Sequence, residues 1–201
     1  MQAYIIHDSA RTDRDAYVDA VRRLVPDLRV VQPVQHDNPM ISCNLTHKFA
    51  LQQAQQDCAK QDPRLCASWV MEDDIWLRPE FTVAHWQELA DWLTISPYQL
   101  LLGGIATSNG QRKIADNLVE IQNFSSTHCY VLRHDAIPIV MALPAEQHFD
   151  GLLTVADIRK VVTVPFLATQ WPGHSTIRRH VVDDSKTFAT AETHLLNVVH
   201  G

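Results

Sequence analysis

Short apolar runs alternate with segments of helical periodicity along most of the chain. Apolar runs of this length are typical of buried strands, and apolar residues three and four positions apart are typical of helices that cover a sheet. We predict strands over residues 3–7, 28–31, 67–71, 99–102, 127–132 and 161–164. We predict helices from residue 12 or 13 up to Pro26, and over residues 44–60, 81–93, 135–143, 150–158 and 190–199.

The alternation of strands and helices with short connections predicts an α/β fold with a mainly parallel central sheet flanked by helices. At 201 residues the chain is most simply one domain that spans residues 1–201. Residues 106–123 interrupt the pattern, because they are polar and have weak periodicity. They form either a flexible loop over the site or a pair of small edge strands.

Composition and charge narrow the class of protein. With 46% hydrophobic and 20% charged residues, the chain has the composition of an ordinary globular protein. The net charge of -6 argues against a non-specific nucleic-acid binder, which needs a basic surface, but it leaves a local basic groove open. The first residues lack the basic start of a signal peptide, and no apolar run approaches the roughly 20 residues of a membrane span. We therefore expect a cytoplasmic protein without a membrane span.

The four cysteines support the same expectation. They form no Cys-x-x-Cys pair, and nothing around them indicates secretion. We expect all of them to be reduced thiols, as in most cytosolic proteins. They are Cys43, Cys58, Cys66 and Cys129.

Three consecutive carboxylates, Glu72, Asp73 and Asp74, follow directly on the apolar run 67–71. Carboxylates near a core are costly unless a cation or hydrogen-bond donors compensate for them. In open α/β sheets, ligands bind at the carboxyl ends of the strands. A hard cation such as Mg²⁺ or Mn²⁺ that itself holds phosphates suits this position. The alternative is an acidic loop or a helix N-terminus with three solvated charges.

A second polar stretch, residues 43–47, begins the predicted helix over residues 44–60. Thr46 and His47 would lie in its first turn, where backbone N–H groups and the helix dipole favour an anion such as a diphosphate. The alternative is that Asn44 caps the helix and His47 is a surface residue.

Two later residues have side chains that suit catalysis. Asp150 lies near a predicted helix start and is either a general base or an N-cap. His174 lies in a turn-rich segment, residues 170–177, and is either a metal ligand contributed from far along the chain or a solvated loop residue.

Further short motifs stand in order along the chain: residues 5–7 followed by Arg11 and Arg14, residues 43–47, residues 71–74, Gly103–Gly104, residues 129–132, Phe149–Asp150, and Gln170 with Ser175 and Ile177. This series, which spans residues 4–177, resembles glycosyltransferases of the GT-A type, with a single Rossmann-like domain. It is most similar to the lipopolysaccharide-biosynthesis β-galactosyltransferase family (glycosyltransferase family 25). Residues 71–74 match the LEDD motif of that family, whereas Ser42, Asn44 and Thr46 depart from its helix motif.

The resemblance implies a nucleotide-sugar donor, a UDP-sugar, and a divalent cation, Mn²⁺ or Mg²⁺. Asp74 would ligate the metal, and Glu72 or Asp73 would bind a metal-bound water or the donor ribose. His174 would be the C-terminal metal ligand, although the family pattern supports Ser175 better.

The same resemblance implies roles for the remaining candidates. Thr46 and His47 would lie near the donor, and Asp150 would be the base that removes a proton from the acceptor hydroxyl in an inverting displacement. Arg11 and Arg14 follow the first strand, where they would contact nucleotide or phosphate. Their alternative is an ordinary pair of solvated charges before a helix.

Several functions compete with transfer to a saccharide acceptor. A modified base in phage-type DNA is one alternative acceptor, for which Arg112, Lys113, Arg178 and Arg179 would supply a phosphate-binding strip. A non-catalytic module that binds sugar nucleotides is another alternative, and the intact carboxylates argue against it. Metal-dependent phosphotransfer or nuclease chemistry also uses acidic clusters, but it would not explain the other motifs.

Overall fold

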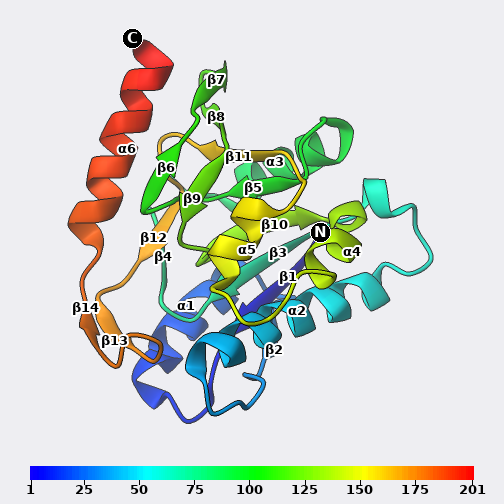
Figure 1. Cartoon of the computed structure of the whole chain (residues 1–201), viewed down its shortest axis with the longest axis vertical. Helices are drawn as coiled ribbons and strands as arrows, with labels where there is room; N and C mark the ends of the chain where they lie inside the picture. Colours follow the sequence, from blue (N-terminus) through cyan, green and yellow to red (C-terminus); the bar gives the residue numbers. More distant parts are fainter.

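The computed structural model describes residues 1–201 and contains an eight-stranded sheet with helices on both faces (Figure 1). The strand order is β2-β1-β3-β10-β5-β11-β8-β7. These strands are β1 (Gln2–Ile6), β2 (Arg29–Val31), β3 (Ala67–Glu72), β5 (Leu100–Leu102), β7 (Arg112–Ala115), β8 (Leu118–Ile121), β10 (Cys129–Arg133) and β11 (Lys160–Thr163). All six predicted strands are present, with ends that shift by no more than two residues.

The sheet is mixed, so the prediction of a mainly parallel sheet is wrong. The pairs β1–β2, β1–β3 and β5–β11 are parallel, whereas β10 runs antiparallel to both β3 and β5. At the far edge, β11–β8 and β8–β7 are also antiparallel. The physical reason is the connection from β5 to β10: it consists of short strands instead of a crossover helix, so the chain returns in the opposite direction.

Residues 106–123 form small strands, which was one of the two predicted alternatives. β7 and β8 extend the edge of the main sheet. β6 (Thr107–Asn109) pairs with β9 (Asn123–Ser125) in a separate two-stranded sheet. Two further small sheets join β4 (Ile75–Leu77) to β12 (Ala168–Gln170), and β13 (Gly173–Ser175) to β14 (His180–Val182).

The sheet separates the hydrophobic core into two layers, and helices cover each layer. Successive residues of a strand point to opposite faces, so Tyr4 and Val70 pack on one face while Ile5 and Met71 pack on the other. The first layer is covered by α2 (Pro39–Asp57), α4 (Ile137–Met141), α5 (Phe149–Val155) and α6 (Ser185–His200), and the second by α1 (Asp15–Leu24) and α3 (Val83–Ile95). Short 3₁₀ turns occupy Thr12–Arg14, Pro63–Leu65 and His134–Ala136. None of the helices has the length and apolar character needed to cross a membrane.

Helix α2 begins at Pro39, earlier than predicted. The side chain of Asn38 caps it by accepting the N–H of Met40 at 3.0 Å, and a proline suits the first helical position. Thr46 and His47 therefore lie in the middle of the helix, and the prediction that they occupy its first turn is wrong. Their backbone N–H groups belong to the helix and are not free to bind an anion.

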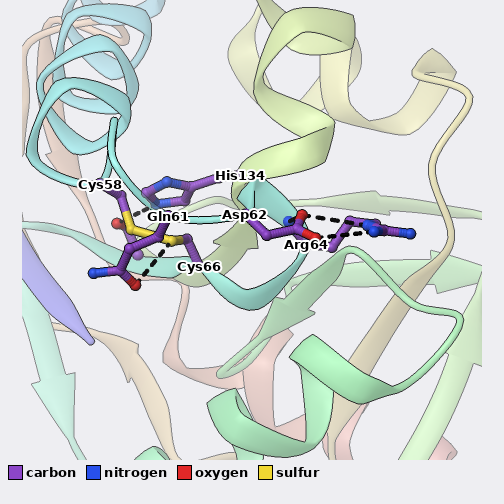
Figure 2. Close-up of a disulfide and its surroundings, with 7 residues drawn as sticks. Cys58, Gln61, Asp62, Arg64, Cys66 and His134 are labelled. Carbon is purple, nitrogen blue, oxygen red and sulfur yellow. Dashed lines mark hydrogen bonds and ion pairs between the residues drawn. A yellow bond between two sulfur atoms is a disulfide. The ribbon is translucent and has the colours of Figure 1, made fainter.

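Two of the four cysteines form a disulfide, so the prediction that all are reduced thiols is wrong for Cys58 and Cys66. Cys58 directly follows α2 and Cys66 directly precedes β3, which brings their Cα atoms to 6.7 Å. Figure 2 shows His134 beside the disulfide. Its Nε2 lies 2.7 Å from the hydroxyl of Ser68. Cys43 and Cys129 are free.

A glycine pair brings the late part of the chain across the end of β5. A Cβ atom on Gly104 would lie only 2.1 Å from the carbonyl oxygen of Ala168, so no larger residue fits there. The carbonyl of Gly103 accepts the N–H groups of Leu167 and Ala168 at 2.8 and 3.1 Å. This close approach places β12 beside β4, the strand that follows the acidic triplet.

Candidate active site

The acidic triplet lies at the carboxyl end of β3, as predicted. Glu72 ends the strand, and Asp73 and Asp74 form the turn into β4. Ile6 of β1 is the register partner of Glu72, and the N–H of Glu72 donates to the carbonyl of His128 at 3.0 Å. The end of β1, the end of β3 and the segment before β10 therefore meet at one edge of the sheet.

Asp73 is already paired on both of its carboxylate oxygens. It forms a buried ion pair with Arg14, and its Oδ2 lies 2.9 Å from Nδ1 of His7. The other ring nitrogen of His7 lies 3.1 Å from Asp15. These contacts tie the start of α1 to the triplet, and they leave Asp73 the least available of the three carboxylates.

Arg14 is a buried cation at this edge of the sheet. Its Nη1 also lies 3.2 Å from Asp74, and its Nη2 donates to the carbonyl of His174 at 3.0 Å. Burial opposes its charge, but Asp74 and Asp73 raise the pKa of Arg14 above the ordinary value. Arg11 is more exposed; it pairs with Asp13 at 2.9 Å and reaches the same carbonyl of His174 at 3.4 Å.

Asp74 and Glu72 are half-buried carboxylates with few partners. Besides its ion pair with Arg14, the carboxylate of Asp74 accepts only one hydrogen bond, a long one of 3.4 Å from the amide of Gln170. Burial, the Glu72 charge and the Asp73 charge raise the pKa of Asp74 from 3.8 to about 7, against the effect of Arg14. Burial acts in the same direction on Glu72, but His47, His128 and Arg14 outweigh it and lower the pKa of Glu72. The two carboxylates thus repel each other across a site that lacks a full complement of cations.

His47 faces Glu72 from the middle of α2. Its Nε2 lies 3.4 Å from Glu72 Oε1 but is not aligned for a hydrogen bond, so this buried nitrogen is unpaired and its attraction to Glu72 is electrostatic. Its Nδ1 lies 3.1 Å from the hydroxyl of Tyr130, and its ring stacks on Phe149 at 4.3 Å between centroids. Thr46, by contrast, fixes the loop after β2, because its hydroxyl oxygen accepts the N–H of Val34 at 2.9 Å.

Asp150 lies in the first turn of α5. Its carboxylate accepts the N–H of Ser126 at 3.0 Å and the N–H of Gly151 at 2.7 Å. Ser126 has a φ of 84°, a left-handed conformation that costs free energy in a residue other than glycine and that recurs at functional sites. Asp150 thus holds a strained backbone position directly beside the site.

Sequence reasoning missed several residues of this edge, among them Ser126 and His128. Burial lowers the pKa of His128 to about 4, so its ring is neutral. Its Nε2 lies 3.2 Å from the carbonyl of Ala168 and donates to it, which leaves Nδ1 to accept from the hydroxyl of Ser126 at 2.9 Å. The adjacent pattern Ser126-Thr127-His128 before an apolar strand was the available signal.

Cys43 is the first residue of the polar stretch 43–47, and its thiol is affected by the acidic residues of the site. Burial and the charges of Glu72, Asp150 and Asp74 raise its pKa well above the ordinary value. The thiol is therefore protonated at neutral pH and is a poor nucleophile.

His174 approaches the site through its backbone. Its carbonyl accepts from Arg14, whereas its imidazole is exposed and forms no hydrogen bond. The three predicted metal ligands do not converge: only Cys58, Cys66 and His134 form a group of three whose ligand atoms lie within 4.8 Å of one another. That group contains the disulfide, and its sulfur atoms are bonded to each other.

An open hollow of about 550 Å³ adjoins the Asp150 side of the site. It lies between the start of α2, the residue that precedes α5, and the β13–β14 hairpin. Its lining includes Asn38, Met40, His148, Ile177 and Arg179.

An α/β sheet that gathers polar side chains at the carboxyl ends of its strands has the arrangement in which such folds bind ligands. The fold of this chain is similar to the crystal structure of a glycosyltransferase involved in the glycosylation of the major capsid of PBCV-1. The TM-score is 0.52, and the match covers 96% of this chain and all of that one at 10% sequence identity, so the likeness is one of fold. The sequence matches no protein-family profile and no curated protein.

Proposed function

We propose that this protein is a glycosyltransferase that moves a sugar from a nucleotide-sugar, a UDP-sugar, to a hydroxyl of a saccharide acceptor. The observation that carries the proposal is the pair Glu72 and Asp74: two half-buried, mutually repelling carboxylates at the carboxyl end of β3. They lie in a fold like that of a known glycosyltransferase. The finer assignment, to the GT-A type, to family 25 and to an inverting mechanism, is part of the proposal.

The residues present fit a divalent cation. The side-chain partners of Asp74 are Arg14 at 3.2 Å and Gln170 at 3.4 Å, and burial and the Glu72 charge raise its pKa. Mg²⁺ is commonly held by one or two carboxylates together with substrate phosphates. Asp74 and Glu72 would hold Mn²⁺ or Mg²⁺, with the remaining positions open to diphosphate and water. When bound, the ion supplies Lewis-acid stabilisation of the charge that develops on the departing nucleotide. The exposed His174 imidazole stays a predicted ligand that would have to turn inward.

Arg14 and Arg11 would add positive charge on the nucleotide side. Both guanidinium groups reach the carbonyl of His174, and Arg14 is buried against Asp73 and Asp74. A guanidinium held in this way suits phosphate oxygens, because it is planar, always charged and fixed before the ligand arrives. Thr46 and His47 would influence the donor only indirectly, His47 through its attraction to Glu72.

Asp150 is proposed as the base that accepts the proton of the acceptor hydroxyl. Its two N–H contacts fix the carboxylate, and Ser126 and Gln170 link it to Asp74. A carboxylate held within reach of the reacting hydroxyl is what a single displacement needs.

A saccharide acceptor fits better than a DNA base. Arg112 pairs with Glu120, Lys113 with Asp116, and Arg178 with Asp184. β7, which carries the first two, and the β13–β14 hairpin lie toward opposite ends of the long axis of the molecule (Figure 1). They therefore do not make the continuous basic strip that DNA phosphates would need.

The proposal is tested by thermal stabilisation with a panel of nucleotide sugars, with and without Mn²⁺. A UDP-sugar should raise the melting temperature only when Mn²⁺ is present, since a ligand of the native state stabilises by mass action. The Asp74→Asn variant should lose this response, whereas Asp116→Asn, a surface carboxylate far from the triplet, should keep it. The absence of any response to every nucleotide sugar in the panel would refute the proposal. The anomeric form of the product, read by NMR, then decides whether the transfer is inverting.

A further inference from the structure

Three aromatic side chains from three separate elements stack against one another next to the acidic triplet. Trp171, just after β12, lies 4.9 Å from Trp76 of β4 and 5.5 Å from Tyr17 of α1, measured between ring centroids. The rings are nearly parallel, with interplanar angles of 27° and 15°. We call this group, Tyr17, Trp76 and Trp171, the aromatic platform.

The platform is exposed although its residues are large and apolar. Trp76 and Trp171 each keep 36% of their surface accessible, whereas Trp69 and Trp86 are fully buried. An exposed cluster of large apolar side chains is an informative departure from ordinary burial. A cluster of this kind is typical of a binding surface.

The platform is rigidly joined to the acidic site. The N–H of Trp171 donates to the carbonyl of Asp74 at 2.7 Å, and Thr169 of β12 is the register partner of Trp76. Between platform and catalytic candidates lies Gln170, whose side chain contacts Asp74 on one side and the hydroxyl of Ser126 on the other, each at 3.4 Å. A ligand on the platform would therefore extend directly toward Asp74 and Asp150.

We propose that the aromatic platform is an acceptor subsite on which a pyranose ring of a saccharide stacks; this rests on the glycosyl transfer proposed above. One face of a pyranose presents polarised C–H groups, which are attracted to the negative face of an aromatic ring. The hydroxyls at the edge of the same sugar need polar partners. Gln170 and Arg78, whose Cζ lies 6.0 Å from the Trp76 ring centroid, stand at the rim to supply them.

The ring spacing excludes a nucleobase held between two rings of the platform. A base held between two aromatic rings needs them about 7 Å apart, two stacking contacts of roughly 3.5 Å each. The observed separations of 4.9 and 5.5 Å leave no such slot, so only the outer surface of the stack is available. An outer surface next to a reactive centre suits a sugar chain that extends into solvent.

The experiment measures the affinity of lactose, cellotetraose and UDP by calorimetry and by intrinsic tryptophan fluorescence. In Trp76→Ala, saccharide affinity should fall on the order of tenfold, as expected for one lost stacking contact. UDP affinity should fall much less. Trp76→Leu retains apolar volume without an aromatic face and should lose saccharide affinity to the same extent, which separates stacking from folding.

The matched control is Trp92→Ala. Trp92 is also a partly exposed tryptophan stacked on a tyrosine, 5.7 Å from Tyr98, but it lies on α3 away from the triplet. It should leave saccharide affinity unchanged. An equal loss in Trp92→Ala, or no saccharide binding that depends on Trp76, would overturn the proposal. An equal loss of UDP affinity in Trp76→Ala would assign the platform to the nucleobase instead.

The two proposals fail in different ways. Turnover of a UDP-sugar without saccharide binding at the platform removes the acceptor subsite and leaves the transferase. Saccharide binding that depends on Trp76, in a protein that binds no nucleotide-sugar, removes the transferase and leaves a carbohydrate-binding surface.

Discussion

Replacing Asp74 by asparagine should make the metal-free protein more stable at pH 8, although it removes a residue of the site. In the folded protein, burial and the charges of Glu72 and Asp73 raise the pKa of Asp74 from 3.8 to about 7. At about 1.36 kcal/mol for each pKa unit, this corresponds to about 4 kcal/mol of destabilisation when the carboxyl is ionised. Asparagine has nearly the same shape and carries no charge at any pH.

The sign of the pH dependence follows from the raised pKa. The protonated carboxyl contributes its full stability below pH 3.8, and this contribution is lost as the pH rises through about 7. The advantage of Asp74→Asn should therefore be largest at pH 8 and should shrink toward pH 5. The value of about 7 already includes the attraction of Arg14, but Asp74 keeps some contact with solvent, so we expect about 2–4 kcal/mol. In a chain of this length, that is a rise of about 5–15 °C in melting temperature.

The assay is urea denaturation in EDTA at pH 5 and pH 8, followed by the same titration with Mn²⁺. Without metal the variant should be the more stable protein; with Mn²⁺ the wild type should gain stability and the variant should not. Asp116→Asn is the control, because Asp116 is almost fully exposed and its pKa is lowered by Lys113. A variant no more stable than the wild type at pH 8 would show that Arg14 already neutralises Asp74 and that no cation is needed.

Three further predictions concern the rest of the site and the fold. Asp150→Asn should keep donor affinity by calorimetry but lower the transfer rate roughly 10²–10⁴-fold; unchanged transfer would remove Asp150 from the mechanism. Cys58→Ser should lower the free energy of unfolding by about 2.5 kcal/mol, because the unfolded chain gains conformational entropy when the loop of residues 58–66 is no longer closed. Dithiothreitol should then have no further effect on the stability of the variant. Arg14→Ala should cost about 3–5 kcal/mol in metal-free buffer, because Asp73 loses its buried cation, and Mn²⁺ should restore part of this.

The strands could be predicted from the sequence, because each is a short apolar run whose pattern does not depend on its neighbours. Their directions could not: nothing in residues 129–133 records that β10 runs antiparallel between β3 and β5. The start of α2 was missed for a related reason. Asn38 and Pro39 form a good helix start, but residues 39–43 lack the apolar periodicity that marks a helix, and this part of α2 is only partly buried or exposed.

The site could be predicted in part. The acidic triplet was visible because three carboxylates after an apolar run are unusual, and the structure places them at the expected strand end. Tertiary contacts that no local pattern records were invisible. They include the stacking of Tyr17 on Trp171, which are far apart in the sequence, and the disulfide between Cys58 and Cys66 at the two ends of the connection between α2 and β3.

Arg14 illustrates why we propose a divalent cation as the partner of the acidic triplet. Glu72, Asp73 and Asp74 bring three negative charges to the end of β3, and Arg14 is the one guanidinium buried against them. Arg14 offsets one of these charges, and partial burial makes the remaining charge costly. Protonation of Asp74 relieves part of that cost, and its pKa of about 7 places this at the edge of the neutral range. In our proposal, a bound divalent ion would relieve the same cost with Asp74 ionised and would hold the phosphates of a donor.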